Sequence, residues 1–261
     1  MPVLCYHAVD PTWRSPLAIT PDRLARDCAW LRRHRRVVSL GEAIDRMNGS
    51  ARLPGGLTVL TFDDGFAGLH RYALPILREH GLPATVFLVA QTLTATRRPV
   101  DWVDDPPPYP PHEGEGTTPH PLATLSRSQV LEMQDAGMTF GSHSYAHRDL
   151  TTLTEAECER DLRASREVLE DLLGRPVPWL AYPRGRHNER VRRAAARAGF
   201  TQAFSLPEGP ESAGMHAVPR AGIWPKDGIR TLRIKTSDWY LGLRTSPAYR
   251  FASRARLKRS A

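Results

Sequence analysis

The sequence predicts an α/β fold, a deformed (β/α)7–8 barrel, because short apolar runs alternate with amphipathic helical stretches along it. This order is typical of parallel strands that are joined by helical crossovers. About seven or eight such runs occur in 261 residues, and an α/β barrel of this length is routinely a single domain. The count fits a closed or nearly closed barrel better than an open sheet.

Each expected strand is a short run rich in apolar and β-branched residues. The expected strands are residues 3–6, 57–62, 84–90, 138–141, 179–182, 201–206 and 217–220. The run 84–90 is apolar except for Thr85, as expected of a strand that is covered on both faces.

The expected helices carry capping signals at their starts. They cover residues 20–34, 66–80, 126–137, 154–174 and 188–198, and the chain is helical again after the last strand. Thr20-Pro21 places a cap before a proline at the first helical position. Two capping boxes are present, one of Ser126 with Gln129 and one of Thr154 with Glu157. Pro75 predicts a kink or a late start in its helix.

Two segments depart from this alternation. Residues 97–121 hold eight prolines and are expected to form a long loop or insertion within a catalytic domain of residues 1–243. Residues 244–261 form a basic tail with five positive charges and no acid from Arg250 onward. The tail permits peripheral contact with a membrane or an anionic substrate, although a solvated terminus is the more ordinary interpretation.

Composition excludes several classes of protein. The formal net charge is +8, but no helix-turn-helix, zinc-finger or RNP-like pattern accompanies it, so we expect no nucleic-acid partner. No apolar run is long enough to span a membrane. The start of the chain does not resemble a signal peptide, which favours a cytoplasmic protein, with a trimmed exported precursor as the alternative. Three cysteines without C-x-x-C spacing predict reduced thiols.

Polar residues gather where five of the expected strands end. Asp63-Asp64-Gly65 follows residues 57–62, and His143 to His147 follows residues 138–141. The other strand ends carry His7, Pro183-Arg184-Gly185 and Arg220. Because catalytic groups of a parallel barrel collect at the carboxyl ends of its strands, we expect one site there.

The acids and histidines at these ends predict a metal site. Neighbouring side chains diverge on an extended backbone, so one of Asp63 and Asp64 can bind a metal while the other faces a water. His143 and His147 are four residues apart and can converge on one cation with Asp64. Three protein ligands leave positions for water and substrate. This set suits zinc, with cobalt, nickel, manganese and iron as alternatives, although an Asp-Asp-Gly turn without a metal is also common.

Three segments resemble the motifs of the polysaccharide deacetylases, carbohydrate esterase family four with the NodB-homology fold. They are residues 61–65 (Thr-Phe-Asp-Asp-Gly), 143–147 (His-Ser-Tyr-Ala-His) and 181–185 (Ala-Tyr-Pro-Arg-Gly). The segments 4–9 and 218–220 resemble the branch that acts on poly-N-acetylglucosamine. The resemblance covers roughly residues 2–240.

The resemblance implies a metal-dependent N-deacetylase of an amino sugar. A divalent metal would be held by Asp64, His143 and His147, and Asp63 would be the general base. The backbone N–H of Tyr182 would stabilise the oxyanion, with Pro183 beside the substrate.

Two family features are missing from this sequence. The arginine expected in the third motif is replaced by Ala181, and Arg220 is the candidate substitute, with a surface salt bridge as the alternative. The late histidine motif that supplies the general acid is absent. We expect His7 to take that role, with His216 as runner-up and a hydrogen-bonded core histidine as the competing interpretation of His7.

The substrate is expected to be a glycan or glycoconjugate that contains N-acetylglucosamine. The aromatic residues that are candidates for stacking on a sugar, each of which is individually more ordinary as packing, are Trp102, Tyr145, Trp224 and Tyr240. A cytoplasmic biosynthetic deacylase of a small or lipid-linked amino sugar is the alternative, and an inactive carbohydrate-binding protein is a distant one. The oligomeric state is left open.

Overall fold

The computed structural model describes residues 2–47, 55–94, 100–103, 120–206, 214–246 and 249. The strands are β1 Val3–Tyr6, β2 Ala8–Val9, β3 Ala18–Ile19, β4 Arg36–Val37, β5 Leu57–Phe62, β6 Thr85–Leu88, β7 Thr139–Ser142, β8 Trp179–Ala181, β9 Gln202–Ser205, β10 Val218–Pro219 and β11 Ala221–Gly222. The α-helices are α1 Pro21–His34, α2 Leu40–Asp45, α3 Leu74–His80, α4 Arg127–Asp135, α5 Glu155–Leu173, α6 Glu189–Arg197, α7 Ile229–Lys235 and α8 Asp238–Arg244.

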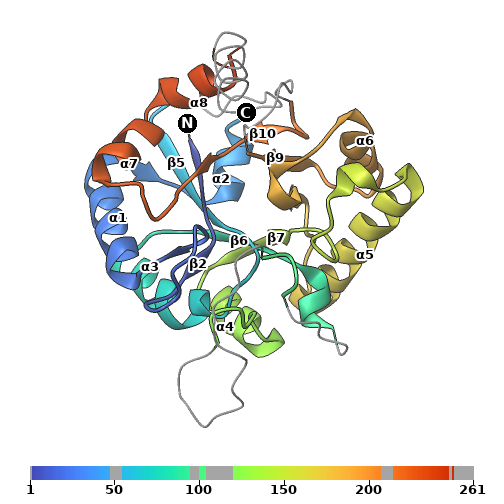
Figure 1. The fold of residues 1–261 in the computed structure, drawn as a ribbon, viewed down its shortest axis with the longest axis horizontal. Coiled ribbons are helices and arrows are strands. Elements are labelled where there is room, and N and C mark those ends of the chain that lie inside the picture. The colour runs from blue at the N-terminus through green and yellow to red at the C-terminus, as the bar shows by residue number, and fades with distance from the viewer. Residues whose placement is uncertain are drawn as a thin grey trace.

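A nearly closed parallel barrel forms the centre of the molecule, as the sequence predicts. Its strands follow the order β10-β9-β8-β7-β6-β5-β1-β11, and every strand pair in this path is parallel. The two ends of the path are separated in sequence by Arg220 alone. The segment 218–222 therefore pairs with β9 through its first half and with β1 through its second. Helices surround the strands on the outside (Figure 1).

Two hydrophobic layers hold the barrel together. The interior layer joins Val3 of β1, Val59 of β5, Phe87 of β6 and Phe204 of β9, and α2 contributes to it as well. A larger outer cluster packs the helices onto the strands, with Leu24 of α1 among its fully buried members. Apolar side chains fill the barrel interior. The polar residues that form the site therefore lie at the carboxyl ends of the strands.

The structure refines the expected elements in three places. The helix expected at 66–80 is a π-helical turn, Leu69–Ala73, followed by α3, so Pro75 lies in the first turn of α3. The last strand, expected at 217–220, is two short strands on either side of Arg220. The sequence patterns do not predict α2 or the short strands β2, β3 and β4. Among the described residues, no helix combines the length and apolar character that crossing a membrane requires.

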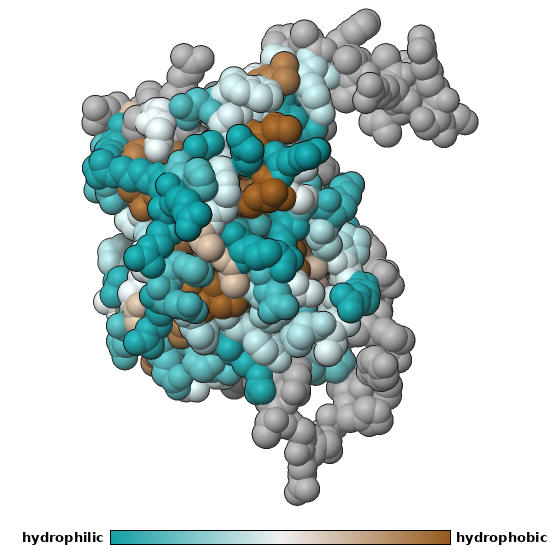
Figure 2. Space-filling view, turned by 90° about the vertical axis from the view of Figure 1, so that its left-hand side faces the viewer, coloured by the Kyte–Doolittle hydropathy of each residue, from teal (hydrophilic) through white to brown (hydrophobic). Residues whose placement is uncertain are grey.

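The surface is largely hydrophilic on the face shown in Figure 2, with separate apolar patches. Most of the expected loop 97–121 and of the basic tail lies outside the described residues. The expected domain boundaries and the role of the tail therefore stay predictions.

Candidate active site

The turn after β5 brings two carboxylates to the mouth of the barrel. The backbone N–H of Asp63 donates to the Tyr6 carbonyl at 2.9 Å, which continues the pairing of β5 with β1. Asp64 then adopts a left-handed conformation with φ of 69°, and Gly65 follows with the same φ. The positive φ of Gly65 strains any other side chain, and a Cβ there would also lie 2.7 Å from Leu88 Cδ2, so this position favours glycine. A strained aspartate after a strand is typical of a functional site.

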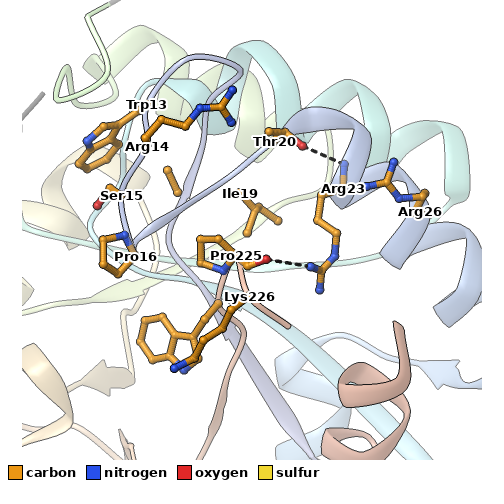
Figure 3. Close-up of a pocket in the computed structure, with 12 residues that line it drawn as sticks. Trp13, Arg14, Ser15, Pro16, Ile19, Thr20, Arg23, Arg26, Pro225 and Lys226 are labelled. Atoms are coloured by element: carbon orange, nitrogen blue, oxygen red, sulfur yellow. Dashed lines mark hydrogen bonds between the residues drawn. The ribbon is translucent and has the colours of Figure 1, made fainter. Parts of the chain in front are cut away.

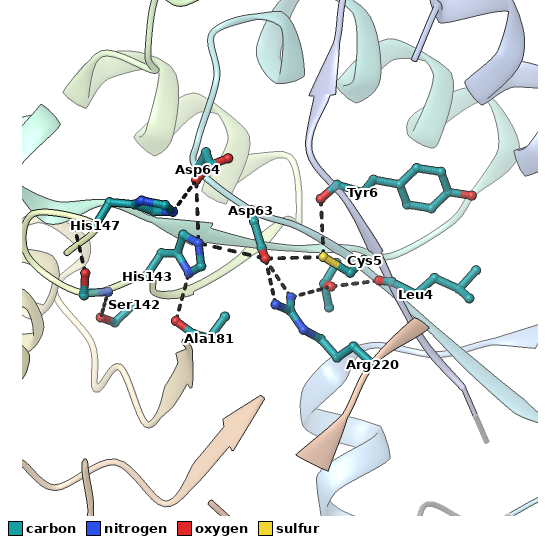
Figure 4. Close-up of polar contacts among 12 residues, drawn as sticks. Leu4, Cys5, Tyr6, Asp63, Asp64, Ser142, His143, His147, Ala181 and Arg220 are labelled. Atoms are coloured by element: carbon teal, nitrogen blue, oxygen red, sulfur yellow. Dashed lines mark hydrogen bonds and ion pairs between the residues drawn. The ribbon is translucent and has the colours of Figure 1, made fainter. Parts of the chain in front are cut away.

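Asp64, His143 and His147 converge on one point (Figure 4). Asp64 Oδ1 lies 3.3 Å from His147 Nε2 and 3.6 Å from His143 Nε2. The ligand atoms of the three residues are all within 4.8 Å of one another, and all three side chains are buried. The structure therefore brings together the three residues that the sequence predicted as metal ligands.

Backbone and side-chain hydrogen bonds set the orientation of the histidines. The Nδ1–H of His143 donates to the Ala181 carbonyl at 2.8 Å, which leaves the Nε2 lone pair facing Asp64. His147 also has a positive φ, 54°, and its N–H donates to Ser144 Oγ at 3.0 Å. Asp161 of α5 accepts from the Tyr145 N–H at 2.9 Å and so anchors the loop between the two histidines.

Electrostatics in the site suit a cation. Burial lowers the pKa of His143 and lowers that of His147 to about 2, so both imidazoles are neutral, as metal ligands must be. Burial, and then the charge of Asp63, raises the pKa of Asp64 to about 8. Asp64 Oδ1 is buried and has no hydrogen-bond partner among the described residues. Acceptor atoms that face one another in a buried site fit a divalent cation, and two imidazoles with one carboxylate are a donor set that zinc prefers.

The Asp63 carboxylate lies beside the cluster of Asp64 and the two histidines, and it is paired with Arg220. Its Oδ2 lies 4.0 Å from His143 Nε2. Arg220 is 0% exposed and donates two hydrogen bonds of 2.7 Å, one to each carboxylate oxygen. Burial alone would raise the pKa of Asp63, but Arg220 and then His143 outweigh burial and hold the pKa below its ordinary value. Arg220 is thus a buried partner of Asp63, not a surface salt bridge.

Comparison with known proteins identifies the family. The family model of the polysaccharide deacetylases matches residues 51–203, more than half of the chain. This chain belongs to the polysaccharide deacetylase family. It is 25% identical over 238 residues to the poly-beta-1,6-N-acetyl-D-glucosamine N-deacetylase of Staphylococcus epidermidis, a match that covers 85% of this chain and 73% of that protein.

Two solved structures have the same fold as this chain. The Streptococcus pyogenes deacetylase PplD superposes with a TM-score of 0.68 at 23% identity, over 95% of this chain and 98% of that one. IcaB from Ammonifex degensii gives a TM-score of 0.68 at 24% identity, over 94% and 96% of the two chains. Both matches show the NodB-type barrel.

Cys5 and Thr61 are further polar members of the Asp63 cluster that the sequence motifs did not single out. The Cys5 thiol donates to Asp63 Oδ2 at 3.3 Å, and Thr61 Oγ1 accepts from the Arg220 guanidinium at 3.1 Å. Each lies two residues before a predicted site residue, His7 or Asp63, and period-two alternation along a strand directs such pairs to one face. That alternation is the signal that could have found them.

His7 lies beside Asp63 at the end of β1. Its ring stacks on Trp224, with centroids 5.5 Å apart and an angle of 24° between the rings. Burial lowers the pKa of His7 to about 4, and the charge of Asp63 offsets this only in part. Cys5, His7 and Asp63 form a second group whose ligand atoms lie within 4.8 Å of one another. It suits a cation poorly, because Arg220 already neutralises Asp63 and burial raises the pKa of the Cys5 thiol.

The structure does not support the expected oxyanion role of Tyr182. Its backbone N–H donates to the Phe204 carbonyl at 3.0 Å, and its hydroxyl donates to the His216 carbonyl at 2.9 Å. The N–H is therefore committed to the pairing of neighbouring strands. Pro183 is buried at the start of the turn Pro183–Gly185, where it shapes the end of β8.

The structure also places the runner-up for the general acid and three of the candidate sugar-stacking aromatic residues. His216 Nε2 bonds the Phe200 carbonyl at 2.8 Å, before β9 begins, so this histidine lies at the opposite end of the strands from Asp63. Tyr145 and Tyr240 pack against the outer hydrophobic cluster. Trp102, in contrast, stacks on His147 with centroids 4.8 Å apart and so borders the cluster of Asp64, His143 and His147.

Proposed function

We propose that the chain hydrolyses the N-acetyl amide of a glycan that contains N-acetylglucosamine. The single observation that supports this most is the placement of an ionised carboxylate, Asp63, against the cluster of Asp64, His143 and His147. A protein that only bound carbohydrate would need no base next to a cation site. The Staphylococcus epidermidis relative, a poly-beta-1,6-N-acetyl-D-glucosamine N-deacetylase, supports the same substrate class.

The proposed reaction begins at Asp63. When bound by Asp64, His143 and His147, a divalent cation, for which zinc is our first choice, supplies a Lewis acid and lowers the pKa of water to about 7. Asp63 accepts a proton from the attacking water as the new C–O bond forms. Arg220 keeps Asp63 ionised before the attack and fixes its orientation through two hydrogen bonds.

His7 is the proposed acid that protonates the leaving nitrogen. Its imidazole is neutral at pH 7, so it must gain a proton during the reaction. The proton on Asp63 is within reach, since the carboxylate and a His7 ring nitrogen lie within 4.8 Å. Transfer from Asp63 to His7 and on to the amide nitrogen lets the C–N bond break, which yields acetate and a free amine.

Acetate release from a panel of N-acetylated sugars, from monomer to polymer, tests the proposal. We expect release from at least one oligomer in the presence of zinc and its loss after chelation, because the cation activates both carbonyl and water. An absence of acyl release from every substrate, with the cation bound, would instead indicate a carbohydrate-binding protein.

His7→Gln tests the acid. The variant is expected to lose about 10²–10⁴-fold in turnover of the amide substrate, because the amine leaves only when protonated. Hydrolysis of an aryl acetate, whose phenolate leaves without a proton, should fall much less. His216→Gln is the matched control and should leave both reactions near the wild-type rate. Equal losses on amide and ester in His7→Gln would contradict the assignment.

A further inference from the structure

A cavity lies next to the site, between the segment that leads through β3 into α1 and the loop after β11 (Figure 3). Its volume is about 880 Å³, within the range of ligand-binding pockets. It is lined by Trp13, Arg14, Ser15, Pro16, Ala18, Ile19, Thr20, Arg23, Arg26, Trp224, Pro225 and Lys226. We call this cavity the arginine groove.

The lining of the arginine groove is cationic and contains no carboxylate. Arg23 is paired with Asp27 at 2.8 Å, so its charge is compensated. Arg14, Arg26 and Lys226 make no ion pair within the parts of the chain that the structure describes. Three cations without an ion pair around one cavity produce a positive potential, which favours an anionic ligand.

Aromatic contacts join the arginine groove to the catalytic residues. The Trp224 ring lines the groove and stacks on His7, whose ring nitrogen lies within 4.8 Å of the Asp63 carboxylate. On the other side, Trp13 packs edge-on against Phe66 with ring centroids 5.5 Å apart, just after the Asp63–Gly65 turn. A saccharide with its acetamide at Asp63 could therefore extend over Trp224 into the groove, where indole faces offer an apolar surface.

We propose that the arginine groove binds an anionic substituent, a carboxylate or a phosphate, on the amino-sugar substrate. This inference rests on the proposed deacetylation and narrows its substrate to acidic glycans or phosphorylated amino sugars. Buried Ala18 and Ile19 provide an apolar floor for the sugar, and the cations at the edge contact the acidic group. A neutral polymer of N-acetylglucosamine has no anionic group that could pair with Arg14, Arg26 and Lys226.

The test compares KM and kcat for three substrates. An N-acetylheparosan oligosaccharide carries carboxylates, UDP-N-acetylglucosamine carries phosphates, and an N-acetylglucosamine oligomer is neutral. The groove variant is the double substitution Arg26→Ala, Lys226→Ala. The matched control is Arg163→Ala, Arg193→Ala, which removes the same charge from exposed positions on α5 and α6.

We expect the groove variant to raise KM about tenfold for at least one acidic substrate, because charge-assisted hydrogen bonds are lost, with little change in kcat. The neutral oligomer and the control variant should show no such rise, and added salt should raise the wild-type KM for the acidic substrate. Equal KM values in the groove and control variants for both acidic substrates would overturn the inference.

A calorimetric titration separates this inference from the proposed function. If no substrate releases acetate, the proposed function fails, and binding of the acidic oligosaccharide is measured directly. Weaker binding to the groove variant than to the control variant would support the anionic site. Equal or undetectable binding by both would overturn it.

Discussion

Asp63→Asn is expected to lower turnover of the amide substrate by about 10²–10⁴-fold while one divalent cation stays bound. Asparagine keeps the shape of the side chain but cannot accept the proton of the attacking water. Asp64, His143 and His147 are unchanged, so their ligand atoms still lie together. Steady-state kinetics and the metal content of the purified variant check both parts.

His143→Ala is the matched comparison for Asp63→Asn. It removes one of three expected ligands and should lose both the cation and the activity. If Asp63→Asn lost its cation as readily as His143→Ala, Asp63 would be a ligand and not the base. If it retained wild-type turnover, another group would have to accept the proton.

Arg220→Met is expected to lower the free energy of unfolding by about 3–5 kcal/mol, because it leaves a buried carboxylate without its partner. Arg220 is 0% exposed and Asp63 is 2% exposed, so water cannot replace the lost hydrogen bonds. Loss of the guanidinium also raises the pKa of Asp63, which removes the ionised base and lowers kcat. Urea unfolding monitored by circular dichroism measures the first effect.

A surface pair provides the control for Arg220→Met. Arg186 donates to Asp149 at 2.9 Å, and its side chain is 61% exposed. Arg186→Met should cost at most about 1 kcal/mol, because water screens exposed pairs. Equal losses of stability in the two variants, with kcat unchanged in both, would mean that the buried pair neither stabilises the fold nor serves catalysis.

The sequence predicted those parts of the site that depend on the position of strand ends. Asp63, Asp64 and His143 come directly after apolar strands, and in a parallel barrel such ends lie on one face. For Arg220 the sequence leaves two interpretations open, a partner of Asp63 and a surface salt bridge. Its position depends on how the barrel closes between β10 and β11. Closure is a property of register, which a single sequence does not reveal.

Backbone hydrogen bonding accounts for the difference between the expected role of Tyr182 and its position in the structure. A sequence motif places Tyr182 next to the substrate but does not say whether its N–H is free. In the structure this N–H pairs with Phe204 across neighbouring strands. His216 was the runner-up to His7 for a related reason, since only the fold shows that it lies before β10 and not at the carboxyl end of a strand. Cys5 seemed an ordinary thiol because its contact with Asp63 joins residues 58 positions apart.

Zinc reconstitution with activity read at each step tests the central claim most directly. Chelated protein would be titrated with zinc while bound metal and acetate release are measured together, for the wild type and for Asp64→Ala. We predict that wild-type activity rises in proportion to bound zinc and saturates at one equivalent, whereas Asp64→Ala binds far less and stays inactive. Full activity in the chelated wild type, or tight one-to-one binding that persists in Asp64→Ala, would contradict a catalytic cation held by Asp64, His143 and His147.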